Sequence, residues 1–234
     1  MKSANLIPKH IGFIVDGNRR WARERNLPTL EGHRRGFSKV EKVASEMIDN
    51  GVEYVSFYLF STENWDRSED EVSYLMDLLR HNAKRMAKKF KKENIRCVIM
   101  GRKDPAPEDV LAALKKLEDE TKDGTRGTVA ICFNYGGQWE IADAASKLIK
   151  ERIESGDTSA ISPDEFTKYL YQPEVPPCDL IVRTSGEERI SGFQLWRASY
   201  SEFLFLKKKF PAITTKDCDK ILEEFASRSR RFGK

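Results

Sequence analysis

Strand-like apolar runs alternate with amphipathic helical stretches along the whole chain, and this alternation restricts the fold more than any other feature. The strand-like runs are 11–15, 54–60, 95–100, 128–133, 180–182 and 203–206. The main helical stretches are 37–50, 69–93, 107–121 and 139–154, where apolar residues recur with helical spacing. Strands that are separated by helices usually pair in parallel. The sequence therefore predicts an α/β fold, with a mainly parallel six-stranded sheet and helices on both faces.

The composition is that of one globular domain. With 234 residues, 39% of them hydrophobic and no linker-like segment, residues 1–234 are predicted to form a single domain. The net charge of +4 is too small to indicate a nucleic-acid partner. The four cysteines lack paired spacing, which argues against a zinc site or a disulfide framework. Because no apolar run approaches the roughly 18 residues of a membrane span, and none resembles a signal peptide, we expect a cytoplasmic protein.

A first polar cluster follows the first strand. It consists of Asp16, Gly17, Asn18, Arg19, Arg20 and Trp21. Glycine permits close approach of the backbone to a ligand, a helix start offers unpaired N–H groups, and arginine donates to phosphate oxygens. A carboxylate is tolerated beside an anion when a cation lies between them, so Asp16 is predicted to hold Mg²⁺ against a diphosphate. The alternative is that Asp16 caps a helix and the arginines form a solvated face.

A second polar cluster follows the second strand. It consists of Ser61, Thr62, Glu63, Asn64, Trp65, Asp66 and Arg67. Ligands of open parallel sheets bind beyond the carboxyl ends of the strands, so the two clusters can share one site. His33, in a loop rich in arginine and glycine ahead of helix 37–50, is predicted to face the same edge and contact the ligand, although most single histidines are structural. The alternative for the second cluster is an ordinary loop before a helix, and Ser68 and Glu71 are predicted to form a capping box there.

The long helix at 69–93 allows two interpretations of each face. It would be about 37 Å long, more than a small sheet needs. Its apolar stripe is either core or one wall of an elongated apolar tunnel. Its basic face is either solvated or attracted to anionic lipid, which would allow peripheral membrane contact for product release.

A third polar cluster follows strand 180–182 and runs from Arg183 to Ser191. Two arginines, Arg183 and Arg189, flank a Ser-Gly turn and suit a second phosphate group. Glu202, directly before the last strand, is a candidate second metal ligand. The chain has neither a Walker loop nor a Gly-x-Gly-x-x-Gly motif, which argues against ATP and dinucleotides. These features indicate two substrates with diphosphate heads and apolar tails.

These motifs resemble those of the cis-prenyltransferases, the (Z)-isoprenyl diphosphate synthases that include undecaprenyl diphosphate synthase. The resemblance extends from His10 to Gly233, nearly the whole chain. The motifs that carry it are Asp16-Gly17-Asn18 with Arg20, Trp21 and Ala22; Gly32-His33 with Gly36; Phe60 to Trp65 with Arg67; Asn134-Tyr135-Gly136-Gly137; Arg183 to Glu187 with Arg189, Ser191, Phe193, Leu195 and Trp196; Tyr200 with Glu202; and Arg230-Arg231-Phe232-Gly233. The all-helical trans-type synthases instead carry Asp-rich motifs, which this sequence lacks.

The resemblance implies an Mg²⁺-dependent prenyltransferase. It would condense isopentenyl diphosphate onto an allylic diphosphate, such as farnesyl diphosphate, to give undecaprenyl diphosphate or a shorter polyprenyl diphosphate. The residues implied are Asp16 and Glu202 for the metal; Gly17, Asn18, Arg19, Arg20 and His33 for the allylic diphosphate; Arg183, Arg189 and Ser191 for isopentenyl diphosphate; Trp21 and Ile190 for substrate binding in general; Asn64 for proton removal; and Ser61, Thr62, Glu63, Trp65 and Arg67 for closure over the substrates. Arg231 and Gly233 match a motif that reaches the active site across a homodimer interface.

Three residues depart from the family pattern. Thr29 stands where many relatives have an arginine for the allylic diphosphate, and Arg19, where many have glycine, is a candidate to compensate. Glu188 occupies a position that is a metal-binding histidine in some relatives. Leu59 stands where a small residue often lines the product tunnel, so we expect a product shorter than undecaprenyl diphosphate.

Two other classes of protein are alternatives to this enzyme. One is a non-catalytic subunit that binds phospho-isoprenoids, although a pure binder has no use for the metal-binding acid. The other is a phosphatase or phosphotransferase, for which the sequence offers neither a nucleophile nor a nucleotide loop.

Overall fold

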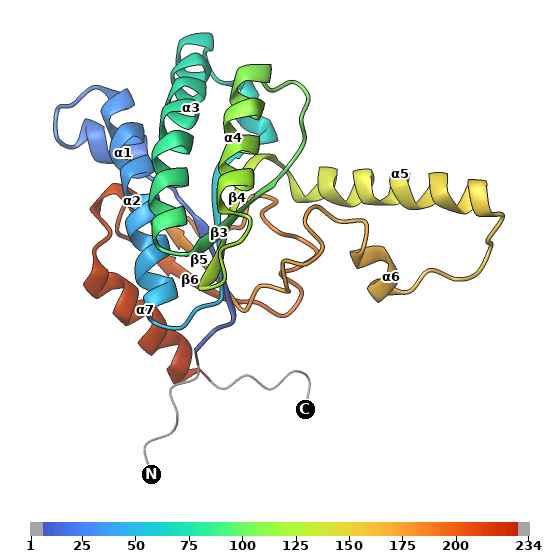
Figure 1. Ribbon diagram of the computed structural model, residues 1–234. Helices are drawn as coiled ribbons and strands as arrows, with labels where there is room; N and C mark the ends of the chain where they lie inside the picture. The colour runs from blue at the N-terminus through green and yellow to red at the C-terminus, as the bar shows by residue number, and fades with distance from the viewer. Residues whose placement is uncertain (1–6, 229–234) are drawn as a thin grey trace.

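The computed structural model describes residues 7–228, which form a six-stranded sheet in the order β3-β4-β2-β1-β5-β6 (Figure 1). All neighbouring strands of this sheet run parallel. The strands are β1 (His10–Ile14), β2 (Tyr54–Ser61), β3 (Ile95–Met100), β4 (Gly127–Tyr135), β5 (Leu180–Thr184) and β6 (Glu202–Leu206). The helices are α1 (Asn18–Arg23), α2 (Thr29–Asp49), η1 (Thr62–Asp66), α3 (Glu69–Lys92), α4 (Glu108–Thr121), α5 (Gly137–Ser155), α6 (Pro163–Thr167), η2 (Phe210–Ala212) and α7 (Thr215–Ser227). The α/β fold predicted from the sequence is confirmed.

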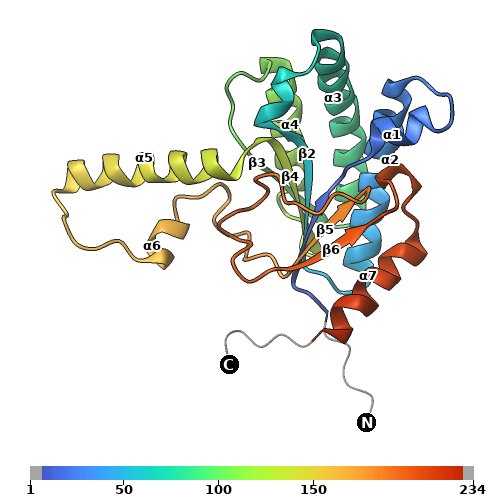
Figure 2. The same ribbon diagram turned by 180° about the vertical axis from the view of Figure 1, so that it is seen from behind.

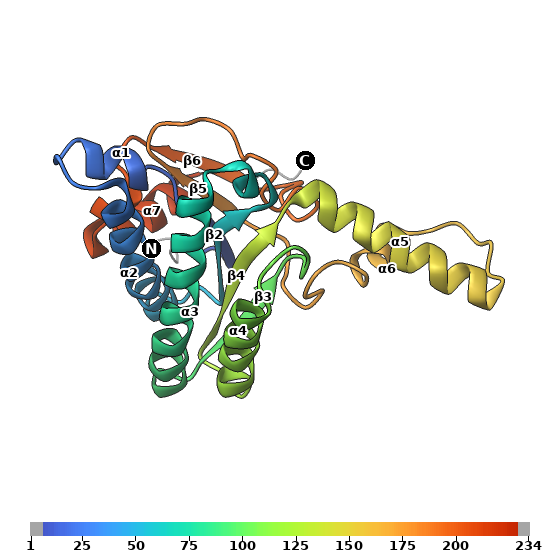
Figure 3. The same cartoon turned by 90° about the horizontal axis from the view of Figure 1, so that it is seen from above.

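One face of the sheet is covered by α2, α3, α4 and α7 (Figures 1 and 3). Alternate residues of each strand point to this face, as expected from the two-residue period of a β-strand. Phe13 of β1 and Phe57 of β2 stack there, with ring centroids 5.4 Å apart. Most of the apolar stripe of α3, including Leu79, Met86 and Phe90, is packed in this core.

The opposite face is covered mainly by irregular chain before and after β5, whereas the sequence predicted helices on both faces. Val175, Cys178 and Phe193 from this segment pack on Tyr58 and Cys132 of the sheet. Left-handed backbone recurs along the segment, with φ of 46° at Gln172, 48° at Ser191 and 48° at Gln194. Such residues interrupt a right-handed helix. Meanwhile α5 projects away from the sheet as an arm (Figures 1 and 2).

Helix α2 begins at Thr29, well ahead of the start predicted at residue 37. Gly32 and Gly36 therefore lie on the helix, one turn apart, and not in a loop. A Cβ atom on Gly32 would be 2.0 Å from the backbone oxygen of Asn18, and one on Gly36 would be 2.3 Å from Asn18 Oδ1. The two glycines thus allow the first polar cluster to lie directly on α2.

None of the helices within residues 7–228 is both long enough and apolar enough to cross a membrane.

Candidate active site

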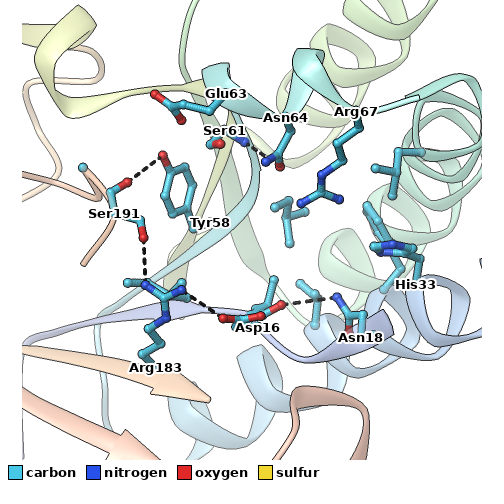
Figure 4. Close-up of a pocket in the computed structure, with 18 of the residues that line it drawn as sticks. Asp16, Asn18, His33, Tyr58, Ser61, Glu63, Asn64, Arg67, Arg183 and Ser191 are labelled. Carbon is cyan, nitrogen blue, oxygen red and sulfur yellow. Dashed lines mark hydrogen bonds and ion pairs between the residues drawn. The ribbon is translucent and has the colours of Figure 1, made fainter. Parts of the chain in front are cut away.

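The three polar clusters meet at one edge of the sheet. They lie at the carboxyl ends of β1, β2 and β5, and these strands are neighbours in the order β2-β1-β5. Because the strands are parallel, their carboxyl ends lie at the same edge. Side chains from all three clusters line one cavity of about 630 Å³ (Figure 4). The predicted residues that line it are Asp16, Asn18, His33, Ser61, Glu63, Asn64, Arg67, Arg183 and Ser191.

Asp16 is held between the first and third clusters. Its Oδ1 accepts a hydrogen bond of 2.6 Å from the backbone N–H of Gly17, and its Oδ2 accepts one of 2.9 Å from Arg183 Nη2. Arg20 Nη2 lies 3.4 Å from Oδ1. Gly17 has φ of 95°, and a Cβ atom there would lie 2.6 Å from Ser185 Oγ, so only glycine fits this turn. The carboxylate therefore contacts arginines from two clusters that are far apart in the sequence.

The carboxylate of Asp16 fits a magnesium ion that is also bound by a substrate. It does not fit a metal site in which protein side chains supply all the ligands. Among the described residues there is no group of three or more His, Cys, Asp or Glu side chains suited to hold a metal. Mg²⁺ is typically bound by one or two carboxylates, with phosphate oxygens and water completing its octahedral shell. Asp16 can supply such a carboxylate beside a diphosphate.

Glu202 is not brought to this site. It begins β6, where it pairs in register with Leu180, which in turn pairs with Ile11. Asp16 lies five residues beyond Ile11, about 16 Å further along the strand direction. Glu202 instead accepts a hydrogen bond of 3.1 Å from Arg228. The prediction that Glu202 joins Asp16 around one metal is wrong within a single chain, because a residue that precedes a parallel strand lies at the opposite edge from one that follows it.

The third cluster places one buried and one exposed arginine at the site. The Arg183 side chain is 6% exposed, and its Nη1 donates to the carbonyl of Arg189 at 2.6 Å and to Ser191 Oγ at 2.8 Å. The Arg189 side chain is 62% exposed and pairs with Glu187 at 2.6 Å. Glu187 also pairs with Arg20 at 2.7 Å, and the two arginines lower the pKa of its carboxyl. Glu187 therefore links the first and third clusters at the rim.

The second cluster forms a capped turn of 3₁₀ helix, η1. The amide oxygen of Asn64 accepts from the backbone N–H of Ser61 at 3.2 Å, which fixes the Asn64 side chain at the cavity wall. Trp65 Nε1 donates to Asn134 Oδ1 at 2.8 Å. Consequently Trp65 does not line the cavity but packs behind it against Phe60.

The predicted capping box of Ser68 and Glu71 is wrong. Ser68 precedes α3 but makes no side-chain cap bond. Glu71 Oε1 instead faces His33 Nε2 at 3.2 Å and accepts from Arg67 Nη1 at 2.9 Å. Its Oε2 lies 3.6 Å from Arg19. Contacts with His33, Arg67 and Arg19 have replaced the local cap.

Several predicted residues surround the cavity without lining it. These are Gly17, Arg19, Arg20, Trp21, Thr62, Trp65, Arg189 and Ile190. Thr62 Oγ1 donates a hydrogen bond of 2.9 Å to Glu63, and the guanidinium of Arg25 lies over the ring of Trp21. Ile190 packs against the apolar cluster on the face of the sheet opposite α2 and α3. Arg231 and Gly233 lie outside the described residues.

The inner end of the cavity is apolar, with Phe37 and Val40 from α2, Leu59 from β2 and Leu75 from α3. Beyond these side chains the helices are packed into the core, so this cavity does not continue along the length of α3. Sequence reasoning missed Tyr58, which lines the cavity and whose hydroxyl lies within 3.3 Å of the carbonyls of Tyr135 and Ser191. Burial raises the pKa of this hydroxyl. The only signal in the sequence was its position, two residues before the end of the predicted strand 54–60.

Comparison with known proteins decides the family. A family profile described as "Putative undecaprenyl diphosphate synthase" matches residues 14–233. The chain belongs to this prenyltransferase family. It is 42% identical to an isoprenyl transferase of Thermotoga maritima, over 97% of each chain. It is 39% identical to the ditrans,polycis-undecaprenyl-diphosphate synthase ((2E,6E)-farnesyl-diphosphate specific) of Micrococcus luteus, over 99% of this chain and 93% of that protein.

One solved crystal structure has nearly the same fold as this chain. The prenyltransferase chain superposes on lavandulyl diphosphate synthase from Lavandula x intermedia, crystallised with dimethylallyl diphosphate, with a TM-score of 0.91. The two chains are 28% identical, and the match covers 97% of this chain and 99% of the other. The predicted membership of the cis-prenyltransferases is therefore confirmed.

Proposed function

We propose that this cis-prenyltransferase condenses isopentenyl diphosphate with an allylic diphosphate, such as farnesyl diphosphate, in an Mg²⁺-dependent reaction. The contact between Asp16 and Arg183 is the observation that carries the proposal. It joins a metal-binding carboxylate of the first cluster to an anion-binding guanidinium of the third, above a cavity with an apolar end. Two diphosphates with isoprenoid tails match that combination.

The first cluster is proposed to hold the allylic diphosphate. Arg19 and Arg20 would pair with its oxygens, and His33 would donate to it from α2. Asp16 would hold Mg²⁺ together with this diphosphate, and the bound ion would stabilise the charge that grows on the leaving group. Arg20, which lies 3.4 Å from Asp16, would add to that stabilisation.

The third cluster is proposed to hold isopentenyl diphosphate, through Arg183, Ser191 and Arg189. The double bond of this substrate adds to the allylic carbon as the carbon–oxygen bond to the leaving diphosphate breaks. A proton is then lost from the new chain to form the cis alkene. Since an amide is a poor base, we propose that Asn64 positions the proton acceptor, which is a water or a diphosphate oxygen.

The deciding assay measures transfer of labelled isopentenyl diphosphate onto farnesyl diphosphate, with and without Mg²⁺. The Asp16→Ala variant is compared with Asp70→Asn, which removes an exposed acid outside the site. We expect Asp16→Ala to lose at least about 100-fold in rate, and the control to keep the wild-type rate. Binding without chain growth in the wild type would favour the non-catalytic subunit, and release of phosphate without chain growth would favour a phosphatase.

We further propose that the working form is a homodimer with α5 and α6 at the interface. Helix α5 and the segment between α5 and α6 expose three large apolar side chains to solvent. These are Ile149, Ile153 and Ile161, with exposed fractions of 55%, 77% and 52%. Large apolar side chains gathered on a projecting arm favour a protein partner. Sedimentation of the wild type and of Ile153→Asp tests this, and a monomeric wild type would contradict it.

We also propose peripheral contact between the basic face of α3 and anionic membranes. Lys84, Arg85 and Lys88 are exposed on this helix. Each basic residue near an anionic surface contributes about 1 kcal/mol. Flotation with phosphatidylglycerol vesicles tests the contact, and equal flotation with neutral vesicles would argue against it.

A further inference from the structure

Glu71 lies behind two residues that line the cavity but does not line the cavity itself. His33 comes from α2 and Arg67 from the segment after η1, and both side chains reach the cavity wall (Figure 4). Their shared partner is Glu71 Oε1, at 3.2 Å from His33 Nε2 and 2.9 Å from Arg67 Nη1. The Glu71 side chain is 11% exposed, so water screens these contacts only weakly. One carboxylate therefore joins two separate parts of the cavity wall.

The same carboxylate also reaches the first polar cluster. Arg19 Nη1 lies 3.6 Å from Glu71 Oε2. Glu71, Arg67 and Arg19 are the charged groups that face His33, from α3, from the segment after η1 and from α1. Without Glu71, a protonated His33 would face two guanidinium groups and no nearby counter-charge.

We propose that Glu71 is a positioning residue for the allylic diphosphate: it holds His33 and Arg67 toward the cavity. This inference rests on the proposed function, because it takes the anion in the cavity to be an allylic diphosphate. A carboxylate that accepts a hydrogen bond from one ring nitrogen of a histidine fixes the tautomer and the orientation of the ring. With Nε2 directed at Glu71, Nδ1 becomes a donor only when the ring carries both protons.

The electrostatic environment of His33 agrees with this role. Burial lowers the pKa of His33, with Arg67 and Arg19 adding to the effect, whereas Glu71 acts in the opposite direction. Replacing Glu71 by a neutral side chain leaves only the influences that lower the pKa. A dianionic substrate would then meet a neutral imidazole over a wider range of pH.

The test compares Glu71→Gln with Asp70→Asn. Both changes replace a carboxylate by an amide in the first turn of α3, but Asp70 is exposed and its side chain forms neither a hydrogen bond nor an ion pair within residues 7–228. We expect Glu71→Gln to raise the KM for farnesyl diphosphate roughly tenfold. The KM for isopentenyl diphosphate should change less than threefold, because Arg183 and Ser191 do not contact Glu71. Asp70→Asn should leave both KM values at the wild-type level.

A second measurement separates positioning from a general loss of structure. The chain has three histidines, so NMR titration of labelled imidazoles, with His33→Gln for assignment, follows His33 directly. Glu71→Gln should lower the pKa of His33, because the carboxylate that opposes the effect of burial is lost, while Asp70→Asn leaves it unchanged. Thermal unfolding of each variant reports whether the fold is intact.

The outcomes distinguish this inference from the proposed function. If the wild type transfers no isopentenyl diphosphate, the proposed function fails, and the positioning role for an allylic substrate fails with it even where the pKa shift is found. If the wild type is active but Glu71→Gln matches Asp70→Asn in both KM values, or leaves the pKa of His33 unchanged, the inference alone is overturned. Equal increases in the two KM values would also overturn it.

Discussion

His10 is a fully buried histidine at the opposite edge of the sheet from the active site, and it makes the fold sensitive to acid. Its Nε2 lies 2.7 Å from Ser56 Oγ in β2, and its Nδ1 lies 2.9 Å from the carbonyl of Pro176. A carbonyl can only accept, so Nδ1 carries the proton and Nε2 accepts from the serine hydroxyl. The neutral ring therefore satisfies both neighbours, and a second proton would place a buried positive charge on the ring and reverse the Ser56 hydrogen bond.

The loss of stability at acidic pH follows from the lowered pKa of His10. Burial lowers the pKa of His10 from 6.5 to about 4, with a further contribution from the positive charge of Arg197. Between these values the unfolded chain binds a proton that the folded chain does not, so the free energy of unfolding falls as the pH falls. The stability contributed by the neutral form of His10 is fully present above pH 6.5 and is lost progressively as the pH falls to 4. From pH 8 to pH 5 the loss is about 2 kcal/mol, a large part of a typical total of roughly 5 to 15 kcal/mol.

Urea unfolding at pH 8 and pH 5 measures this loss, in the wild type, His10→Gln and His81→Gln. His81 is an exposed histidine on α3 and serves as the matched control. The wild type and the His81 variant should each lose about 2 kcal/mol more between the two pH values than His10→Gln does. The comparison uses changes with pH, so a lower starting stability of His10→Gln does not affect it. Equal losses in all three proteins would refute the reasoning.

Two further predictions concern the active site. Gly36→Ala should lower kcat/KM by roughly a hundredfold, because the new Cβ would lie 2.3 Å from Asn18 Oδ1 and displace the first polar cluster. Steady-state kinetics measure this, and a variant with wild-type activity would show that the close packing is dispensable. Leu59→Ala should lengthen the product, since Leu59 closes part of the apolar end of the cavity. Chromatography of extracted products measures chain length, and an unchanged product would contradict the prediction.

The sequence alone predicted the parallel sheet and the edge at which the chemistry gathers. Both follow from local information, because hydrophobic periodicity reports strands and helices, and parallel connection sends the end of each strand to the same side. Asp16, Asn64 and Arg183 each follow a predicted strand, and they line one cavity in the structure. The family resemblance, carried by ordered motifs, was confirmed by the comparisons.

Only the tertiary structure decided which side chains are partners. Asp16 and Arg183 are 167 residues apart, and they meet because β1 and β5 are adjacent, a pairing that local patterns do not specify. Glu71 fits a capping box by spacing, yet packing of α2 against α3 offers it His33 instead. Glu202 belongs to a family motif, yet strand direction places it at the far edge of the sheet. Periodicity along a chain determines which elements form, whereas contacts between distant residues depend on strand order and helix packing, and these emerge only when the whole chain is folded.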